Sequence, residues 1–334
     1  MPTDPRTQPS SPDGTGVVRI VARSDGATRR LEGMAALRDA LADPACRVWV
    51  DVTTTSPQDV EPVARLLQLH PLIAEDIVER NQRAKFVEVG GTVHVVLFWI
   101  AYQGEVTEVE VDLVLGSRAL LSVHEAGWDP MALPQLRGDP GVHLERGPDF
   151  LLYAIADGIV DGYFPVIDAL DDEIDALQDD VIQQPTTWTL ERLFALKREL
   201  IRLRRAMSPS REIFNQLTNR DLGLIRPEHI VYFRDVYDHL IRVTDELDND
   251  RELVAGTLEV YLSTVNNNLS TIMKRLTGVT VILAGIGAFA GVFGMSEAGT
   301  ALSDREAGGF WIITAVLVLG AMATAFVLRR IDWI

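Results

Sequence analysis

Residues 277–295 read TGVTVILAGIGAFAGVFGM and contain no charged side chain. An apolar stretch of about 19 residues is long enough for one helical crossing of a bilayer, at a rise of about 1.5 Å per residue. A second apolar run, GFWIITAVLVLGAMATAFVL, occupies residues 309–328. The two runs predict a pair of transmembrane helices that follow a long, charged region with the composition of a soluble domain.

The charge and composition of the whole chain exclude several classes of protein. The 334 residues have a formal net charge of −17, which argues against nucleic acid as a partner and against attachment to anionic lipid. Cys46 is the only cysteine, so the chain has neither an internal disulfide nor a thiolate metal cage. No phosphate-binding loop or catalytic triad spacing stands out, and an enzyme is therefore not expected.

The N-terminal part of the chain alternates segments typical of strands and of helices. Strands are predicted at 17–22, 47–51, 85–89, 92–101, 105–115 and 119–124, and helices at 33–42 and 56–69. Gly90-Gly91 separates two of these strands and predicts a hairpin. This region is expected to be a mixed α/β domain.

From residue 149 onward the spacing of apolar residues is helical. Residues 150–182 are acidic and residues 189–205 end in basic side chains, so the two segments form either a charge-paired hairpin or two separately solvated faces. After about residue 228 apolar residues recur every three or four positions. This pattern predicts one helix of roughly 100 Å that runs through the first span to Met295. Such a helix must pack on copies of itself or on the α/β domain.

The expected fold class is an α+β membrane protein. Its predicted parts are a disordered leader (1–16), a cytoplasmic α/β domain (17–148), an acidic and basic helical hairpin region (149–226), a stalk helix (227–276), transmembrane helix 1 (277–295), an external loop (296–308), transmembrane helix 2 (309–328) and a cytoplasmic basic tail (329–334). Lys274 and Arg275 precede the first span, and Arg329 and Arg330 follow the second. The positive-inside rule therefore places both termini of this multi-pass protein in the cytoplasm, with the spans in the inner or plasma membrane.

One face of the long helix carries small and polar residues. This stripe consists of Asn266, Ser270, Met273, Thr277, Thr280, Ala284, Gly287, Gly291 and Gly294. Such a face turns toward another helix or toward water rather than toward lipid. Close helix packing and the wall of a pore are both compatible with it. A pore would need several subunits around an axis, because two spans from one chain cannot enclose a water path.

Several ordered motifs resemble those of the CorA-type divalent-cation transporters, over nearly the whole chain from about residue 45. The matching stretches are LHPLIAEDIVERNQRAK (69–85), LLYAIADGIVDGYFPVIDALDDEID (151–175), LKRELIRLRRAMSPSRE (196–212), YFRDVYDH (232–239), MKRLT (273–277) and FGMS (293–296). The resemblance implies a homopentamer in the lipid bilayer, in which the first spans line a pore and the second spans form an outer ring.

The resemblance also implies that divalent cations, Mg²⁺ above all, are both substrate and regulator, with no organic cofactor. The family's regulatory acids fall on Asp76 and Asp235, with Glu75 close by. Metal held between subunits by these acids would keep the pore shut. Carboxylates suit Mg²⁺, a hard ion that keeps most of its waters.

The chain departs from the family at several pore positions. Gly294-Met295-Ser296 stands where the family has Gly-Met-Asn, and a serine ring would be wider and would hold a hydrated ion less well. Ser270 aligns with an asparagine of the family's inner pore, Gly287 with a threonine, and Ala284 with a bulky gate residue. Each of these substitutions shortens the side chain.

The sequence thus supports a metal-gated channel or transporter for Mg²⁺, with Co²⁺ and Ni²⁺ as further candidate ions. Two alternatives stay open. One is a Zn²⁺ transporter of the same family, and the other is a poorly selective or non-conducting membrane sensor that kept the scaffold. The short side chains at Ser296 and Gly287 favour the sensor more than an ordinary family sequence would.

Overall fold

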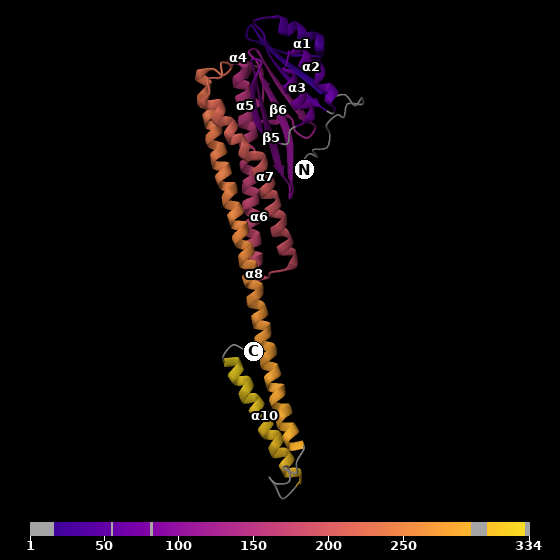
Figure 1. The fold of residues 1–334 in the computed structure, drawn as a ribbon, viewed down its shortest axis with the longest axis vertical. Coiled ribbons are helices and arrows are strands. Elements are labelled where there is room, and N and C mark those ends of the chain that lie inside the picture. The colour runs from indigo at the N-terminus through magenta and orange to yellow at the C-terminus, as the bar shows by residue number, and fades with distance from the viewer. Residues whose placement is uncertain (1–16, 55, 81–82, 295–305, 331–334) are drawn as a thin grey trace. The chain divides into compact units, whose positions relative to one another are not determined.

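The computed structural model describes residues 17–54, 56–80, 83–294 and 306–330. The chain forms two compact units (Figure 1). The first comprises Met1–Leu177 and Glu191–Ala255, and the second comprises Gln178–Leu190 and Gly256–Ile334. The predicted leader (1–16) and most of the predicted external loop (296–308) lie outside the described residues.

A seven-stranded sheet lies at the centre of the first unit (Figure 1). Its strands are β1 (Val17–Ser24), β2 (Ala27–Leu31), β3 (Arg47–Thr54), β4 (Lys85–Val89), β5 (Thr92–Tyr102), β6 (Val106–Leu115) and β7 (Ala119–Glu125). They lie in the order β2-β1-β3-β7-β6-β5-β4, with β3 and β7 parallel and the other neighbours antiparallel. The mixed α/β prediction is confirmed. The prediction missed strand β2, because its sequence ATRRL has no buried residue and so shows no alternation of apolar and polar side chains.

The predicted hairpin joins β4 to β5. Gly90 and Gly91 have φ angles of +62° and +74°, a conformation that glycine adopts without strain and that suits a tight two-residue turn. The predicted helix at 56–69 is shorter and broken. Ser56 caps a 3₁₀ turn, η1 (Pro57–Asp59), by accepting a hydrogen bond from the Gln58 N–H, and α2 (Glu61–Leu66) follows.

Helices α1 (Gly33–Ala42), α2 and α3 (Pro71–Glu79) pack on one face of the sheet. Leu37 of α1 and Ile73 of α3 share a continuous apolar core with Ile20, Val50 and Leu121 of the strands. The burial of these apolar side chains holds α3 in place, and α3 carries two of the predicted regulatory acids.

The opposite face of the sheet is covered mainly by α5 (Pro148–Asp161), which contacts β3, β5, β6 and β7. The 3₁₀ turns η2 (Pro130–Ala132) and η3 (Pro134–Leu136) and the short helix α4 (Gly141–Arg146) lead into α5.

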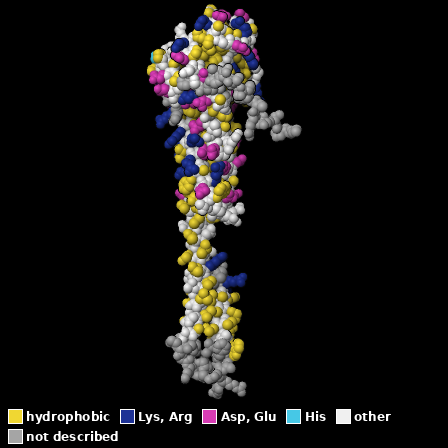
Figure 2. All heavy atoms as spheres, turned by 90° about the vertical axis from the view of Figure 1, so that its right-hand side faces the viewer, with side chains coloured by type: hydrophobic (Ala, Val, Ile, Leu, Met, Phe, Trp, Pro, Cys, Tyr) yellow, Lys and Arg dark blue, Asp and Glu magenta, His cyan; other side chains and the backbone are white. Residues whose placement is uncertain are grey.

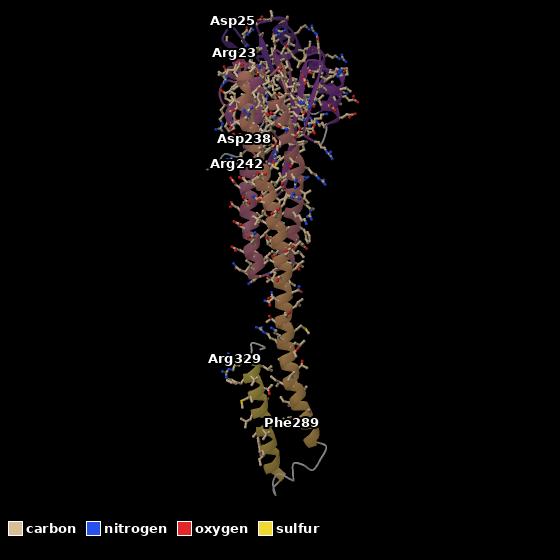
Figure 3. All side chains as sticks on the ribbon, turned by 60° about the vertical axis from the view of Figure 1, so that its left-hand side comes forward. Arg23, Asp25, Asp238, Arg242, Phe289 and Arg329 are labelled. Atoms are coloured by element: carbon tan, nitrogen blue, oxygen red, sulfur yellow. The ribbon has the colours of Figure 1, made fainter. Side chains whose placement is uncertain are left out.

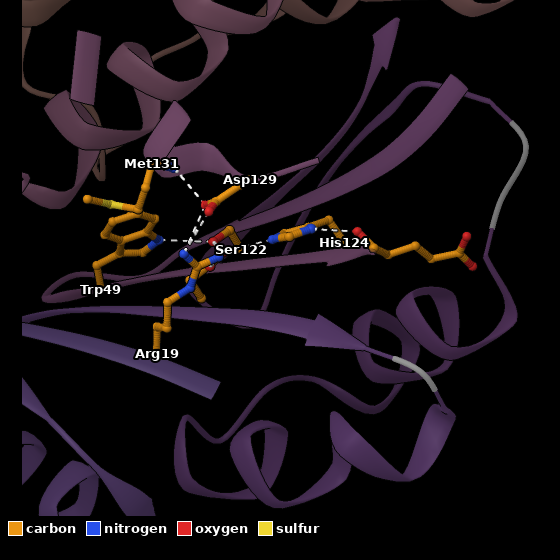
Figure 4. A network of polar contacts seen from close by, with 8 residues as sticks. Arg19, Trp49, Ser122, His124, Asp129 and Met131 are labelled. Atoms are coloured by element: carbon orange, nitrogen blue, oxygen red, sulfur yellow. Dashed lines mark hydrogen bonds and ion pairs between the residues drawn. The ribbon is translucent and has the colours of Figure 1, made fainter. Parts of the chain in front are cut away.

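A buried polar network crosses three strands (Figure 4). The Trp49 Nε1–H donates to Ser122 Oγ at 2.9 Å, and the Ser122 hydroxyl donates to Asp51 Oδ1 at 2.6 Å. Arg19 pairs with Asp51 at 3.1 Å, and His124 Nε2 lies 3.3 Å from Asp51. A serine, a histidine and an aspartate meet here, but all three are buried and the serine donates to the aspartate. The network is therefore structural and is not a nucleophilic triad.

Three further helices are α6 (Phe164–Gln183), α7 (Thr187–Asn219) and α8 (Ile230–Gly294), and the larger part of α6 and of α7 and the first part of α8 belong to the first unit. Helix α8 has 65 residues, and it confirms the single long helix that the sequence predicted. A 3₁₀ turn, η4 (Pro227–His229), precedes it.

The stretch with helical spacing at 150–182 forms two helices, α5 and α6. The chain leaves the helix between Asp161 and Phe164, where Gly162 follows the last turn of α5. The buried Tyr163 donates its hydroxyl hydrogen bond to the Phe98 carbonyl of β5 at 2.6 Å. This tertiary contact holds the chain at the break, and Pro165 in the first turn of α6 lacks the N–H that would bond to the Asp161 carbonyl in a continuous helix.

The basic residues of α7 are shared among several partners. Arg192 pairs with Glu173 of α6, as a charge-paired hairpin requires. Arg202 instead pairs with Glu108 of β6 at 3.1 Å, and Arg204 with Asp248 of α8 at 2.8 Å. Electrostatic pairing therefore connects α7 to the sheet and to α8 as well as to α6.

The second unit contains the C-terminal part of α8 and helix α10 (Glu306–Arg330), which begins three residues before the predicted second span. The apolar part of the Pro227–Gly291 helix is 6 % buried, as expected for a helix that faces lipid or other subunits. The most apolar 18-residue window of Pro148–Gln183 is equally hydropathic, but 72 % of it is buried inside the protein, so this window belongs to the core. On the face shown in Figure 2, hydrophobic side chains predominate along α10 and the apolar stretch of α8 beside it, and Lys and Arg side chains lie at one end of this stretch.

Candidate metal-binding and pore-lining residues

The first two predicted regulatory acids lie on α3. His70 and Pro71 start this helix, and the His70 ring accepts a hydrogen bond from the Leu72 N–H. Glu75 is exposed, whereas Asp76 is half-buried and pairs with Lys85 Nζ at 2.5 Å. Asp76 is thus neutralised within its own chain, and a metal ion at this carboxylate would have to compete with Lys85.

Asp235, the third predicted acid, lies on α8 in its second turn and is exposed. The structure does not place Asp235 in a common ligand cluster with Glu75 and Asp76 among the described residues of a single chain. Its charge acts instead on α5: it contributes to the raised pKa values of Tyr153 and Asp157, in which burial is the main cause.

A different group has the spacing of a metal site. Asp157 and Asp161, one turn apart on α5, and His239 on α8 place one ligand atom each within 4.8 Å of one another. His239 Nδ1 lies 3.2 Å from Asp161 Oδ1. The Gln135 amide donates to both carboxylates, at 3.0 Å to Asp157 and 2.9 Å to Asp161, and holds them in orientation.

The electrostatics of this group favour a cation. Desolvation by burial raises the pKa of Asp157, and the neighbouring charge of Asp161 raises it further. Two carboxylates and an imidazole suit Co²⁺, Ni²⁺ or Zn²⁺, while Mg²⁺ would take the carboxylate oxygens and keep its waters. Sequence reasoning did not single these residues out. The available signal was the Asp-x₃-Asp spacing of ADGIVD, with a histidine one turn after Asp235.

The predicted pore-lining stripe lies on α8 in the second unit. All its members from Asn266 to Gly291 are exposed in the single chain, although the Thr280 hydroxyl is occupied by its own helix, donating to the Leu276 carbonyl at 2.7 Å. Gly294 is the last residue of α8, and Met295 and Ser296 lie outside the described residues. The Gly-Met-Ser motif therefore remains a sequence prediction.

Helix α10 packs on the other side of α8. A cavity of about 290 Å³ lies between them, lined on α8 by Val281, Ile282, Gly285, Ile286 and Phe289, and on α10 by Val316, Leu317, Gly320, Ala321 and Thr324. Figure 3 labels Phe289 on α8 and Arg329 at the end of α10. At 3.6 residues per turn, the α8 residues that line this cavity lie roughly opposite the stripe of Thr280, Ala284, Gly287 and Gly291. The partner helix of the same chain thus leaves the stripe uncovered.

A cluster of two carboxylates and a histidine on α5 and α8, followed along the chain by an apolar helix pair with an uncovered small-residue face, is the arrangement expected of a membrane protein that handles ions. The family model of the CorA-like Mg²⁺ transporter protein matches residues 47–330. The chain belongs to this family, whose members are divalent-cation transporters.

Individual relatives agree with this assignment. The chain is 35 % identical to the cobalt/magnesium transport protein CorA of Thermotoga maritima over 261 residues, 76 % of this chain and 74 % of the relative. It is 24 % identical to the zinc transport protein ZntB of Yersinia pseudotuberculosis over 312 residues, 90 % and 93 % of the two chains. Its fold matches the complete structure of the CorA magnesium transporter from Methanocaldococcus jannaschii with a TM-score of 0.79, over 95 % of this chain and 99 % of that one at 22 % identity.

Proposed function

We propose that the protein is a homopentameric channel for divalent cations, with Mg²⁺ as the main ion and Co²⁺ and Ni²⁺ as further substrates. One observation carries the proposal: the stripe from Asn266 to Gly291 is exposed on α8, on the side away from α10. Small and polar side chains make poor contacts with lipid tails, whereas they allow helices to approach closely or to line a water path. In the proposed assembly the stripe therefore faces the same stripe of neighbouring copies around an axis. The α10 helices then form the outer ring.

The proposed orientation places both termini in the cytoplasm and the spans in the inner or plasma membrane. Lys274 and Arg275 of α8, with Arg329 and Arg330 of α10, would lie at the cytoplasmic interface. The large acidic unit then lies in the cytoplasm, where it would be exposed to the metal ion that regulates the pore.

Regulation is proposed to use Glu75 and Asp76 of one subunit and Asp235 of the next. These acids repel when empty and are bridged by Mg²⁺ when it binds, which would hold the subunits together and the pore shut. An arriving ion would displace Lys85 from Asp76.

Limited proteolysis with and without Mg²⁺ tests the regulatory proposal. The double variant Asp76→Ala, Asp235→Ala is expected to lose the protection that Mg²⁺ gives the wild type. The matched control, Glu79→Ala with Asp238→Ala, removes two exposed acids from the same helices and keeps that protection. Equal Mg²⁺ protection in both double variants would contradict these regulatory roles.

Zn²⁺ is a second candidate substrate because His239 adds an imidazole to the Asp157 and Asp161 carboxylates. A poorly selective or non-conducting sensor is the other alternative, because Ser296 replaces the amide expected at the outer pore. Flux into proteoliposomes with Mg²⁺, Co²⁺, Ni²⁺ and Zn²⁺ in turn separates these functions. If Ser296→Asn gains Mg²⁺ flux that the wild type lacks, the sensor is favoured.

A pair of glycines tests the pore itself. Gly287 lies on the stripe and Gly285 in the cavity beside α10, and a Cβ atom added at either position meets no other atom of the described chain within 4 Å. Gly287→Leu is expected to reduce the ion flux by about tenfold or more, because the added side chain narrows the pore. Gly285→Leu places its side chain in the cavity instead, and its ion flux is expected to stay within about threefold of the wild-type flux. Equal losses in the two variants, or a monomeric protein by light scattering in detergent, would refute the pore.

A further inference from the structure

The contact between α6 and α8 in the first unit contains an unusual acid. Asp250 of α8 is 2 % exposed, and its Oδ2 accepts no hydrogen bond from an N–H or O–H donor of the described residues. A buried carboxylate without a cation or donors is costly, so this group needs either a counter-charge or a proton.

The groups that face Asp250 are acids. Asp171 approaches from α6, and Glu246 lies one turn earlier on α8. Helix α7 contributes Arg204, but this guanidinium is engaged by Asp248 at 2.8 Å, as is Arg251 at 2.9 Å. The bases of this region are therefore paired with Asp248, and the contribution of every group identified as acting on Asp250 is repulsive.

We propose that the buried Asp250 carboxyl carries a proton at neutral pH, and that loss of this proton opens the α6–α8 contact. Without the proton, Asp250 would be a buried charge with no donor at Oδ2 among the described residues and with acids as its neighbours, so repulsion would replace the contact. The Arg242 guanidinium of α8, which lies 4.2 Å from the centre of the Phe164 ring of α6, holds the same helix pair at a second point and is insensitive to pH in this range.

The titration supports this arrangement. Burial first, and then the hydrogen bond and charge of Asp171, raise the pKa of Asp250 to about 8. The pKa of this acid is raised in the closed contact above the value of about 3.9 that it has when exposed. The free energy that favours the closed contact is therefore fully present at low pH, and it is lost as the pH rises from about 3.9 through the raised pKa. The sensitive window therefore covers the physiological range and ends just above pH 8.

Limited proteolysis of the full-length protein in detergent between pH 6 and pH 8, with EDTA present, tests the proposal. Proton linkage predicts that the equilibrium constant for opening this contact increases about 50-fold between pH 6 and pH 8 in the wild type. This increase is measured relative to a variant that has no titrating acid at position 250. Asp250→Asn keeps the shape of the side chain but needs no proton, so its cleavage is expected to lack this rise. Asp245→Asn, an exposed acid on the same helix, keeps the wild-type rise and corrects for the pH profile of the protease.

Three outcomes would overturn the proposal: a flat wild-type profile, an Asp250→Asn profile as steep as that of the wild type, or loss of the rise in Asp245→Asn. Asp171→Asn provides an independent variant should Asp250→Asn fold poorly; because burial remains the main cause of the raised pKa of Asp250, this variant is expected to make the rise smaller without abolishing it. The readout is conformational, so it distinguishes this proton site from the transport proposal, which can fail or hold separately.

Discussion

The start of α8 is expected to depend on one buried carboxylate. Asp149, in the first turn of α5, is 2 % exposed and accepts hydrogen bonds from the Arg226 backbone N–H at 3.1 Å and from the His229 ring Nδ1 at 2.6 Å. These bonds join α5 to the turn that precedes α8. Asp149→Ala removes the acceptor, so the buried His229 ring and the part-buried Arg226 N–H both lose their hydrogen bond to it.

The expected loss follows from these contacts. Hydrogen bonds to a charged group contribute about 1.5–3 kcal/mol each, and an acid in the first turn of a helix adds about 0.3–1 kcal/mol. Asp149→Ala breaks two such hydrogen bonds, and we expect it to lower the free energy of unfolding by about 3–5 kcal/mol. At about 2–4 °C per kcal/mol for a unit of this size, the unfolding midpoint should fall by about 6–20 °C.

Tryptophan fluorescence during a thermal scan in detergent reports on this unit, because Trp49 and Trp128 are buried in it. Asp149→Asn keeps one acceptor oxygen and should lose roughly half as much as Asp149→Ala. Asp168→Ala, which removes an exposed acid from α6, should change stability by less than about 0.5 kcal/mol. A shift below about 2 °C for Asp149→Ala would refute the reasoning.

Two further predictions concern α8. Gly256 lies in the helix interior, and a side chain added there meets no atom of the described chain within 4 Å; Gly256→Ala should therefore stabilise the protein by about 0.5–1 kcal/mol in the same thermal scan. Ala255→Gly, the reverse change at the neighbouring exposed position, should destabilise it by a similar amount, and destabilisation by Gly256→Ala would indicate a close contact with another subunit. His239→Ala should weaken Co²⁺ binding by at least about tenfold in calorimetric titration and affect Mg²⁺ less, because only the softer ion prefers imidazole. Unchanged Co²⁺ affinity would show that Asp157, Asp161 and His239 do not bind the metal together.

Local patterns were sufficient for the long elements. The three- and four-residue spacing after residue 228 predicted α8, and Gly90-Gly91 predicted the β4–β5 hairpin, because the helix period and the φ angles of glycine act over a few residues. The resemblance to a known family supplied Asp76 and Asp235 as regulatory candidates, and the family itself is confirmed.

Contacts between distant segments could not be derived in this way. Gly162 and Pro165 mark the break before α6 in the sequence, whereas the hydrogen bond from the Tyr163 hydroxyl to a β5 carbonyl is visible only in the structure. The cluster of Asp157, Asp161 and His239 joins residues about 80 positions apart, as does the pair of Asp171 and Asp250. Spacing shows which side chains share a helix face but not which element lies opposite.

By itself the sequence determined the two apolar spans, the continuous stalk helix and the small-residue stripe, since each is a property of one helix and its period. Only the tertiary structure decided that α10 packs on the far side of α8 and leaves that stripe uncovered. It also decided which acids meet across helices, because the pKa of Asp250 and the geometry around His239 arise from burial and from neighbours that the chain order does not reveal.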